Sequence, residues 1–388
     1  MESIYIKNLG PIDDIFIEDF KPFTILIGDS GSGKSTLIKT MALFRWINKM
    51  VNIRSYLKNA GISKSPFRFR SETLFKTSGL DDMCTANTII KYSYITANNT
   101  YTFEYSNRSL KGTDVIYMKD DVSYQKIAFL SEKRVVIPDW ADKGAKLAGG
   151  YLNFHFHESY GVFDDATNAI SNIRLDYIGM DFNVKKSGNT KKFFVKPLGE
   201  HPKHDSLEFK KSSSGMQSSI PLALVANYYS KYFDYSAAFR NTVIKYLLQT
   251  DKLSSFKDVS NLSDMKKQIH LHIEEPELSL FPDAQCKLLN YIVAESFISN
   301  LKDREINLTI ATHSPYIINQ INVLLKAQQK NKLFDGAALD GSKIGVYRVF
   351  EGKLQNLLAT DNATNQLVVN TYDLSETMNT IYDNYENL

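Results

Sequence analysis

Hydrophobic and polar residues follow two different periods along this chain of 388 residues. Short apolar runs at residues 4–6, 14–17 and 23–27 are separated by turn-forming residues, which predicts three short strands near the N-terminus. From residue 35 to residue 50 the apolar positions recur at helical spacing instead. The pattern therefore predicts a helix directly after the third strand.

The middle of the chain has a pattern typical of antiparallel strands. Residues 89–130 alternate aromatic or branched residues with polar ones, and candidate hairpin turns lie at 98–99 and 111–112. We therefore expect an antiparallel sheet here rather than a βαβ unit. Residues 158–175 predict a helix, and residues 176–200 predict strands around a lysine-rich turn.

The second half of the chain alternates predicted helices with short apolar strands. A helix is predicted from about Ser214, with more helix to about residue 267. It is followed by a buried strand at 269–273, a helix at 282–298, a strand at 307–311, a helix at 315–326 and strands within 344–354. The sequence contains no internal repeat and no sustained heptad pattern.

Composition limits the classes of protein to which the chain can belong. A hydrophobic fraction of 43% is enough to bury a core, and 388 residues can form one large domain or two ordinary ones. The 46 Lys and Arg residues nearly balance the 43 Asp and Glu residues, and the formal net charge is +3. A passive nucleic-acid coat usually has a stronger basic bias, so this charge neither implies nor excludes DNA or RNA binding.

The cysteines and the N-terminal segment indicate a cytoplasmic protein. Cys84 and Cys286 are too few for a disulfide framework or a metal knuckle, which fits a reducing compartment. The N-terminus lacks the charged and apolar regions of a signal peptide. No stretch approaches the roughly 18 apolar residues that span a bilayer, so we expect a soluble protein without a membrane partner.

A phosphate-binding motif is the strongest chemical signal in the sequence. The segment GDSGSGKS at residues 28–35, which we call the phosphate loop, fits G-x-x-x-x-G-K-S/T between a predicted strand and a predicted helix. Glycines let the backbone wrap closely, so that N–H groups face phosphate oxygens. Lys34 supplies positive charge to the β and γ phosphates, and the Ser35 hydroxyl is a small hard ligand for Mg²⁺. The candidate nucleotide-binding residues here are Gly28, Ser30, Gly31, Ser32, Gly33, Lys34, Ser35 and Thr36.

Two later strands end in residues that suit phosphate chemistry. The segment IHLHIEEPE at 269–277 ends in acids, of which Glu274 would hold Mg²⁺ through water and Glu275 would orient or deprotonate the attacking water. Two acids after a strand are also common at the start of a helix. The pair therefore indicates a catalytic site only in combination with the phosphate loop. In LTIATHSP at 308–315, His313 can hydrogen-bond a γ-phosphate or the attacking water. The alternating histidines at 270 and 272 are interpreted as hydrogen-bonded core residues or sheet-packing residues rather than a metal pair.

A serine-rich segment opens the helix that begins near residue 214. Serine hydroxyls and free N–H groups at a helix start can bind an anion, although an ordinary serine N-cap has the same sequence. In this segment, SSSGMQ at 212–217, the candidate nucleotide-binding residues are Ser214, Gly215 and Gln217.

The four motifs, in this order, resemble ABC-type ATPases of the RecF, SMC and OLD branch, and the segments at 6–12 and 129–134 (FLSEKR) are similar to that branch as well. The resemblance implies an α/β P-loop NTPase fold: an ABC-type head with a mixed central sheet, an antiparallel β subdomain and a helical subdomain that carries the signature. It implies one head over residues 1–388. The parts would be a phosphate-loop lobe at 1–135, an inserted β and helical region with the signature at 136–267, a core with the acids and the histidine at 268–354, and a tail at 355–388.

The same resemblance implies an Mg²⁺-dependent ATPase. Lys34, Glu275 and His313 would be catalytic, and Ser35 and Glu274 would hold the metal. The signature of one copy would cap the γ-phosphate held by the other, which gives a head-to-tail dimer or a higher oligomer built from dimers. The sequence departs from relatives at two places. At 278–282 it has LSLFP where relatives often have a Leu-His-Pro motif, and at Met216 it lacks the second Gly of transporters. The sequence does not place the glutamine loop of this branch, and Gln125 is a candidate that we do not assign to it.

The task of such a switch is inferred from what the sequence lacks. It has no coiled-coil pattern and no acidic metal cluster of a C-terminal nuclease. A compact ATPase of this kind resembles the stand-alone ATPases of bacterial anti-phage systems (PARIS-type, Septu-type and retron-associated), which implies a sensor or scaffold that controls a separate effector, a nuclease or a toxin. The alternatives are an assembly scaffold with vestigial hydrolysis and a RecF-like DNA clamp. The clamp would bind nucleic acid through Lys185, Lys186, Lys191, Lys192, Lys210 and Lys211, which otherwise form a solvated lysine turn.

Overall fold

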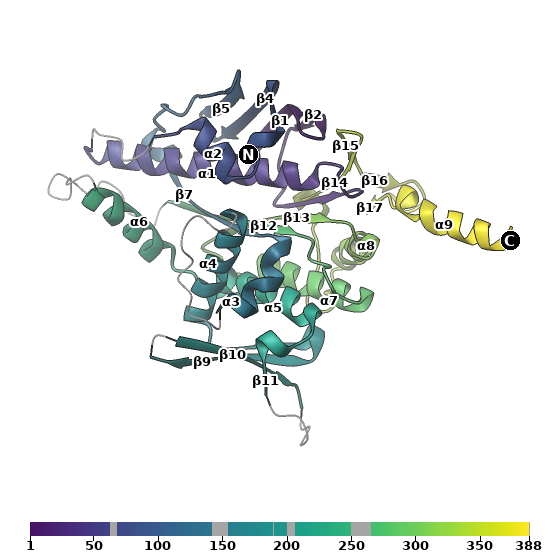
Figure 1. The fold of residues 1–388 in the computed structure, drawn as a ribbon. Helices are drawn as coiled ribbons and strands as arrows, with labels where there is room; N and C mark the ends of the chain where they lie inside the picture. The colour runs from purple at the N-terminus through teal and green to yellow at the C-terminus, as the bar shows by residue number, and fades with distance from the viewer. Residues whose placement is uncertain (63–67, 142–153, 189, 200–205, 250–264, 388) are drawn as a thin grey trace.

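The computed structural model describes residues 1–62, 68–141, 154–188, 190–199, 206–249 and 265–387 (Figure 1). A six-stranded sheet in the order β15-β14-β3-β13-β12-β7 lies at its centre and takes strands from both halves of the chain. Neighbouring strands from β14 to β7 are parallel, and only β15 is antiparallel, which confirms the expected mixed sheet of an α/β fold. The strands are β3 (Phe23–Ile27), β7 (Ser123–Leu130), β12 (Lys266–Glu274), β13 (Glu305–Thr312), β14 (Ile344–Phe350) and β15 (Lys353–Asn356).

An antiparallel sheet in the order β2-β1-β4-β5-β6 forms a second layer. Its strands are β1 (Glu2–Leu9), β2 (Ile12–Ile17), β4 (Cys84–Ile95), β5 (Thr100–Ser106) and β6 (Ser109–Lys111). The turn predicted at 98–99 does connect β4 to β5. The turn predicted at 111–112 is wrong, because Asn107 and Arg108 make it instead, with left-handed φ values of 49° and 57° that suit a two-residue hairpin.

Helix α1 (Lys34–Asn59) lies between these two sheets (Figure 1). The Phe44 ring packs against Tyr92 of β4 with ring centroids 6.2 Å apart, and Arg45 hydrogen-bonds to Thr309 of β13. A helix covered on both sides is buried around most of its circumference, which is why it continues nine residues beyond the predicted end without a polar face.

Arg45 also forms a buried polar network between the layers. Its guanidinium donates to Glu2 Oε2 (2.8 Å), to His272 Nε2 (3.1 Å) and to Thr309 Oγ1 (3.3 Å). His272 Nδ1 donates to the Ala128 carbonyl (3.3 Å), which leaves Nε2 as the acceptor. Burial and the Arg45 charge lower the pKa of both His270 and His272, so the two are neutral core residues, as the sequence indicated.

The remaining helices of the core, α4, α5, α7 and α8, lie on the opposite side of the central sheet from α1 (Figure 1). The helices are α2 (Ser71–Thr77), α3 (Ile137–Ala141), α4 (Phe154–Ala169), α5 (Ser214–Asn227), α6 (Tyr235–Gln249), α7 (Pro282–Val293), α8 (Pro315–Gln329) and α9 (Tyr372–Glu386), with π-helical turns at Tyr228–Tyr232 and Ala294–Ile298. Short 3-10 helices lie at Asp81–Met83, Lys119–Asp121, Glu132–Val136, Asp176–Ile178, Phe209–Lys211 and Gly341–Lys343.

Two smaller sheets complete the fold. One is antiparallel, in the order β11-β10-β9-β8, and the other pairs β16 with β17 ahead of α9, which extends away from the body (Figure 1). The strands are β8 (Asn172–Leu175), β9 (Met180–Ser187), β10 (Thr190–Pro197), β11 (Leu207–Glu208), β16 (Leu358–Asp361) and β17 (Gln366–Val369). The helix predicted at 158–175 ends at Ala169, because β8 pairs with β9. A helix was predicted to continue after α6 up to about residue 267. Residues 250–264 of that stretch lie outside the described residues, and Lys266 is the first residue of β12.

Candidate functional site

Three neighbouring strands of the central sheet end side by side. Ile27 of β3 pairs with Thr312 of β13, and Ala311 of β13 pairs with Glu274 of β12. All three strands are parallel, so their carboxyl ends meet at one edge of the sheet. The phosphate loop, the acid pair and His313 directly follow these ends, and the fold therefore brings together three of the four predicted motifs.

The phosphate loop has a backbone path that only glycine allows at its start. A Cβ atom on Gly28 would lie 2.3 Å from the Val349 carbonyl oxygen of β14. Gly33, at the N-cap of α1, has a left-handed φ of 108°. No side chain caps this helix start, and its first turn contains no acidic residue. The N–H groups and the positive end of the α1 dipole are thus left for an external anion.

Lys34 occupies the interior of the loop. The residue is only 5% exposed. Its Nζ donates to the carbonyls of Gly28 and Asp29, both at 2.7 Å, and to Ser32 Oγ at 3.3 Å. Burial lowers the pKa of Lys34, and the carboxylates of Asp29, Glu275 and Glu277 oppose that shift. The ammonium group is therefore held where phosphate oxygens could replace the loop carbonyls as acceptors.

Glu274 is a buried carboxylate without good hydrogen bonds. It is 2% exposed, and neither of its carboxylate oxygens has a hydrogen-bond partner of good geometry in the described structure. Burial raises its pKa to about 7, Lys39 opposes this shift, Glu132 adds to it, and the nearby Ser35 hydroxyl lowers the pKa. A hydroxyl beside an unsatisfied carboxylate is a set of hard oxygen donors, so these residues fit a divalent cation such as Mg²⁺.

Glu275 and His313 face each other at the exposed edge of the site. Glu275 takes a left-handed φ of 46°, and its backbone N–H donates to the Ala311 carbonyl at 2.8 Å. Its side chain is 37% exposed, and Oε1 lies 3.7 Å from His313 Nε2. A non-glycine residue held at positive φ is often part of a functional site. Here the turn places the carboxylate in solvent beside the histidine.

Glu277 fixes the turn that carries His313, a role that the sequence did not suggest. Its Oε2 accepts from Thr312 Oγ1 at 2.9 Å, and its Oε1 accepts from the His313 backbone N–H at 2.6 Å. The only sequence signal was its membership of the acidic segment at 269–277. The carboxylate thus links the loop after β12 to the loop after β13.

Arg134 is a second residue whose structural role the sequence did not reveal. The only indication was its place at the end of the segment FLSEKR at 129–134, which is similar to the related ATPases. Arg134 is 0% exposed. Its guanidinium donates to four carbonyl oxygens: Ser131 (3.0 Å), Ser218 (2.8 Å), Glu274 (2.7 Å) and Glu275 (2.5 Å). Burial lowers the pKa of Arg134 to about 10, which still leaves it charged at neutral pH. This one cation joins helix α5 to the backbone of both acids.

The serine-rich segment at 212–217, in which Ser214 to Gln217 resemble an S-G-x-Q signature, lies at the start of α5. Ser213 is the N-cap, and its hydroxyl accepts from the Met216 N–H at 3.4 Å. Ser214 is exposed, whereas Gly215 is buried where a Cβ would lie 2.8 Å from the Ser279 carbonyl. Gln217 Nε2 donates to the carbonyls at positions 210 and 212, at 2.9 Å and 3.0 Å. In the described part of the chain, no hydrogen bond joins residues 212–217 to residues 28–36, so the fourth motif does not reach the phosphate loop of its own chain.

Gln125 lies in the interior rather than at the site. It is fully buried in β7, it is in register with Gln268, and its Oε1 accepts from Asn48 Nδ2 at 3.1 Å. Gln268 precedes Glu274 by six residues, which is about 20 Å along a strand. The end of β7 that reaches the site carries Ser131 and Glu132 instead.

Other kinds of site are not found in the described residues. There, no group of three or more His, Cys, Asp or Glu side chains is arranged to hold a metal ion. Both cysteines are free. None of the helices that the structure describes is long and apolar enough to cross a membrane.

No protein-family model matches the sequence, and no curated protein matches it either. Among solved structures, the SMC head domain from Thermotoga maritima is similar with a TM-score of 0.37 and 11% identity, over 95% of this chain and 97% of that one. The recombination mediator protein RecF with ATPrS has a TM-score of 0.35 and 9% identity, over 92% and 97% of the two chains. A dimeric ATP-binding cassette in a post-hydrolysis state, bound to ADP and Pi, is similar with a TM-score of 0.31 and 8% identity, over 91% of this chain and 96% of that one. These TM-scores do not exceed 0.37, so the chemistry of the site is inferred from the residues of this chain.

Proposed function

We propose that the protein is an ATPase of the ABC type that binds Mg-ATP and uses it as a switch for pairing two copies. The observation that carries the proposal is the convergence of the phosphate loop, the acid pair and His313 at one edge of three adjacent parallel strands. Each group has the chemistry that phosphoryl transfer to water needs: an anion cradle, a metal ligand and a base beside a hydrogen-bonding histidine. ATP hydrolysis requires all of them at one place.

The roles of the individual residues follow from their positions. The loop N–H groups and Lys34 would bind the phosphates, and Ser35 and Glu274 would hold Mg²⁺, which neutralises phosphate charge when it is bound. Glu275 is the candidate base, because its carboxylate is accessible and lies beside His313. His313 would donate a hydrogen bond to the γ-phosphate or to the attacking water, and Glu277 positions it.

The start of α5 supports a composite site made by two copies. Ser214 is exposed at a helix N-terminus whose Gly215 packs closely on the loop that follows the acids. This helix start has no hydrogen bond to the phosphate loop of its own chain in the described residues, but it could bind the γ-phosphate held by a second, head-to-tail copy. ADP lacks that phosphate, so the nucleotide state would set the dimer state.

Three variants test this proposal in one experiment. Lys34→Ala is expected to weaken ATP binding strongly, Glu275→Gln to keep binding but slow hydrolysis by about 100-fold or more, and Ser214→Arg to keep binding by the single copy but block ATP-dependent pairing. Calorimetry, phosphate release and light scattering measure the three properties separately. Equal turnover by wild type and Glu275→Gln, or ATP-dependent dimers of Ser214→Arg, would contradict the assigned roles.

The switch has two candidate tasks, control of a separate effector protein in anti-phage defence or clamping of DNA. The lysines proposed for DNA contact already have partners within the chain. Lys191 pairs with Asp164 at 2.7 Å, Lys211 pairs with Glu208 at 3.0 Å, and Lys186 donates to the Asn168 carbonyl at 2.8 Å. This observation weakens the case for a DNA-binding surface at these lysines. Salt-sensitive stimulation of ATP hydrolysis by duplex DNA would favour the clamp instead, whereas co-purification of a nuclease or toxin would support the effector.

A further inference from the structure

The end of strand β7 brings further polar side chains to the metal site proposed at Glu274. Strand β7 is the parallel neighbour of β12, and the last pair of their register joins Leu130 to Ile273. The backbone of Ser131 stays extended, with φ −75° and ψ 169°, so Ser131 continues the strand by one residue beside Glu274. Glu132 follows directly and begins a 3-10 helix. Two polar residues of β7 thus stand next to the acid that ends β12.

Ser131 has an unpartnered hydroxyl on the same face of the sheet as Glu274. Two residues earlier on each strand, the Phe129 and His272 rings stack with centroids 6.0 Å apart, and His272 contacts Arg45 of α1. Because side chains alternate along a strand, Ser131 and Glu274 face α1 as well. They are 1% and 2% exposed, and within the described residues neither the hydroxyl nor the carboxylate oxygens have a hydrogen-bond partner of good geometry. Buried polar atoms without partners are rare, and a hydrated cation would satisfy them.

Glu132 adds a second carboxyl group to this cluster. It is half-buried, and it lies close enough to Glu274 for the two carboxyl groups to interact, which raises the pKa of Glu274. The Ser35 hydroxyl of α1 acts on the same carboxyl group. Two carboxyl groups and two hydroxyls from three elements are hard oxygen donors, the kind that Mg²⁺ prefers. Because this set contains only two acids, it is distinct from the groups of three or more metal-binding side chains that are absent from the described residues.

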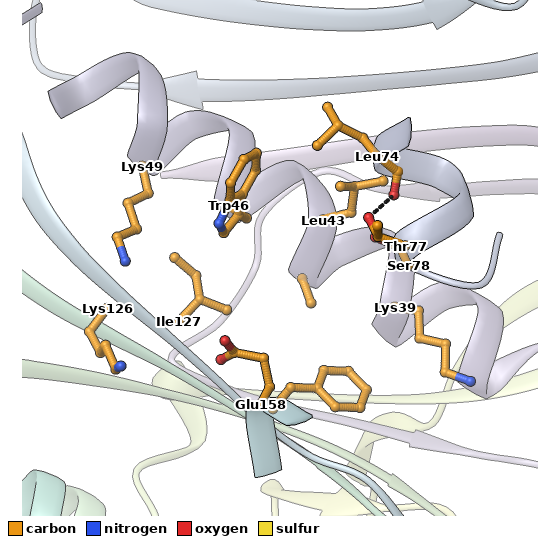
Figure 2. Close-up of a pocket in the computed structure, with 12 residues that line it drawn as sticks. Lys39, Leu43, Trp46, Lys49, Leu74, Thr77, Ser78, Lys126, Ile127 and Glu158 are labelled. Atoms are coloured by element: carbon orange, nitrogen blue, oxygen red, sulfur yellow. Dashed lines mark hydrogen bonds between the residues drawn. The ribbon is translucent and has the colours of Figure 1, made fainter. Parts of the chain in front are cut away.

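The cations near the cluster do not occupy its oxygen atoms. Arg134 donates to four backbone carbonyls and to neither carboxylate. Lys39 lowers the pKa of Glu274 but has no hydrogen bond to it in the part of the chain that the structure describes. Figure 2, a close-up of a cavity that Lys39 lines, shows its ammonium directed away from Glu158. Four carboxylates and three cations act on one another across this region: Glu132, Glu274, Glu275, Glu277, Lys34, Lys39 and Arg134. Their charges leave room for a further cation.

We propose that Glu132 supplies a second carboxylate to the metal of the ATP site, beside Ser35 and Glu274, with the Ser131 hydroxyl as a hydrogen-bond partner for its water. The inference rests on the proposed ATPase and adds a residue to its site. Mg²⁺ keeps several waters and needs few protein ligands, so one more carboxylate strengthens the site substantially. The 3-10 helix that begins at Glu132 also carries Arg134, so the metal and helix α5 share one support.

Calorimetry with AMP-PNP, an ATP analogue that resists hydrolysis, tests this role through binding alone. For each protein the Kd is measured once with EDTA and once with Mg²⁺, and the ratio of the first value to the second gives the contribution of the metal. Glu132→Gln should reduce this ratio by about tenfold or more, as changing one residue of a metal site usually does. In EDTA it should bind AMP-PNP as tightly as the wild type or more tightly, since it lacks one negative charge near the phosphates.

Three further variants serve as controls. Glu274→Gln should reduce the ratio in the same way, and Glu132→Asp, which keeps a carboxylate, should reduce it less than Glu132→Gln does. Glu72→Gln, at an exposed position of α2, should leave the ratio unchanged. Thermal unfolding of Glu132→Gln in EDTA should have a midpoint within about 3 °C of the wild type, because the substitution removes a ligand of the metal and no structural hydrogen bond.

The outcomes separate this inference from the proposed function. An unchanged ratio in Glu132→Gln, or an equal loss of affinity with Mg²⁺ and with EDTA, would overturn the role of Glu132 and leave the ATPase intact. A ratio near one in the wild type would overturn the metal site as a whole. If the wild type bound no AMP-PNP in either condition, the proposed function would be wrong, and this inference with it.

Discussion

Replacing Arg134 by Met is predicted to lower both the stability of the protein and its ATP hydrolysis. The guanidinium is fully buried and donates to four backbone carbonyls, at distances from 2.5 Å to 3.0 Å. Methionine fills much of the same volume but offers no donor. Arg134→Met therefore removes a donor from four carbonyls, of which those of Ser131 and Glu275 keep a backbone hydrogen bond, from the Arg134 N–H at 3.2 Å and the Leu278 N–H at 3.1 Å. Two of the four belong to Glu274 and Glu275, the residues proposed to hold the metal and to activate water.

The size of the effect can be estimated from these contacts. Hydrogen bonds to a charged group contribute about 1.5–3 kcal/mol each, so four of them would sum to about 6–12 kcal/mol. That sum is too large, because removing the cation also recovers the free energy that its burial costs. Leaving a buried acceptor without its donor typically costs about 1–3 kcal/mol, and two of the four carbonyls keep a backbone hydrogen bond. We therefore expect Arg134→Met to lose about 4 kcal/mol of the free energy of unfolding.

Urea unfolding at pH 7, followed by circular dichroism, measures this loss. Arg174→Met is the matched control, because its guanidinium is 67% exposed and its one ion pair within the described ranges is with Asp176, so its removal should not change the midpoint measurably. ATP hydrolysis at saturating Mg-ATP should fall by about tenfold or more in Arg134→Met, as the backbone of Glu275 is no longer held. An unfolding free energy within about 1 kcal/mol of the wild type would refute this account of the buried cation.

Further predictions concern the loop, the turn of His313 and the pH dependence. Gly28→Ala should weaken ATP binding by at least about tenfold in calorimetry, because its Cβ would lie 2.3 Å from a carbonyl oxygen, whereas Gly161→Ala, with open space in α4, should leave binding unchanged. Glu277→Gln should lower kcat with little change in the Kd for Mg-ATP, since its carboxylate orients the turn and does not need to touch the nucleotide; an unchanged kcat would contradict this. Burial raises the pKa of Glu274 from 4.5 to about 7, so the folded protein without ligands binds this proton more tightly than the unfolded chain does. Its unfolding free energy should therefore fall as pH rises between about 4.5 and 7. In parallel urea titrations this fall should exceed that of Glu274→Gln by up to about 3 kcal/mol. An equal dependence of the unfolding free energy on pH in the two proteins would refute the raised pKa of Glu274.

Much of the site could be predicted because its signals are local. A strand that ends in a glycine-rich segment, in two acids or in a histidine can each be recognised within about ten residues of sequence. Parallel pairing then places the three strand ends at one edge, although β3 and β12 are far apart along the chain. The strand, the loop and the helix start therefore lie where the sequence predicted them.

The residues that hold the site together could not be predicted in the same way. Arg134 reaches Glu275 across 141 positions, and Arg45 reaches His272 across 227 positions, so no window of sequence contains both partners. The errors in secondary structure have a similar cause. Residues 172–175 form a strand instead of the predicted helix because they pair with β9. Helix α1 is longer than predicted because two sheets cover it. In each case tertiary contacts outweigh the local pattern.

The two residues missed by the sequence also suggest how pairing and hydrolysis are coupled. Two sets of hydrogen bonds link helix α5 to the loop that follows Glu274: Arg134 donates to the carbonyls of both Ser218 and Glu275, and the Ser218 hydroxyl donates to the Leu278 carbonyl at 2.6 Å. A phosphate that draws the start of α5 toward a second copy would therefore shift the backbone on both sides of Glu275. Because Glu277 in the same loop holds the turn of His313, the base and the histidine would move as one unit. Coupling of this kind requires that Arg134→Met reduce the dependence of ATP hydrolysis on protein concentration, and not only its maximal rate.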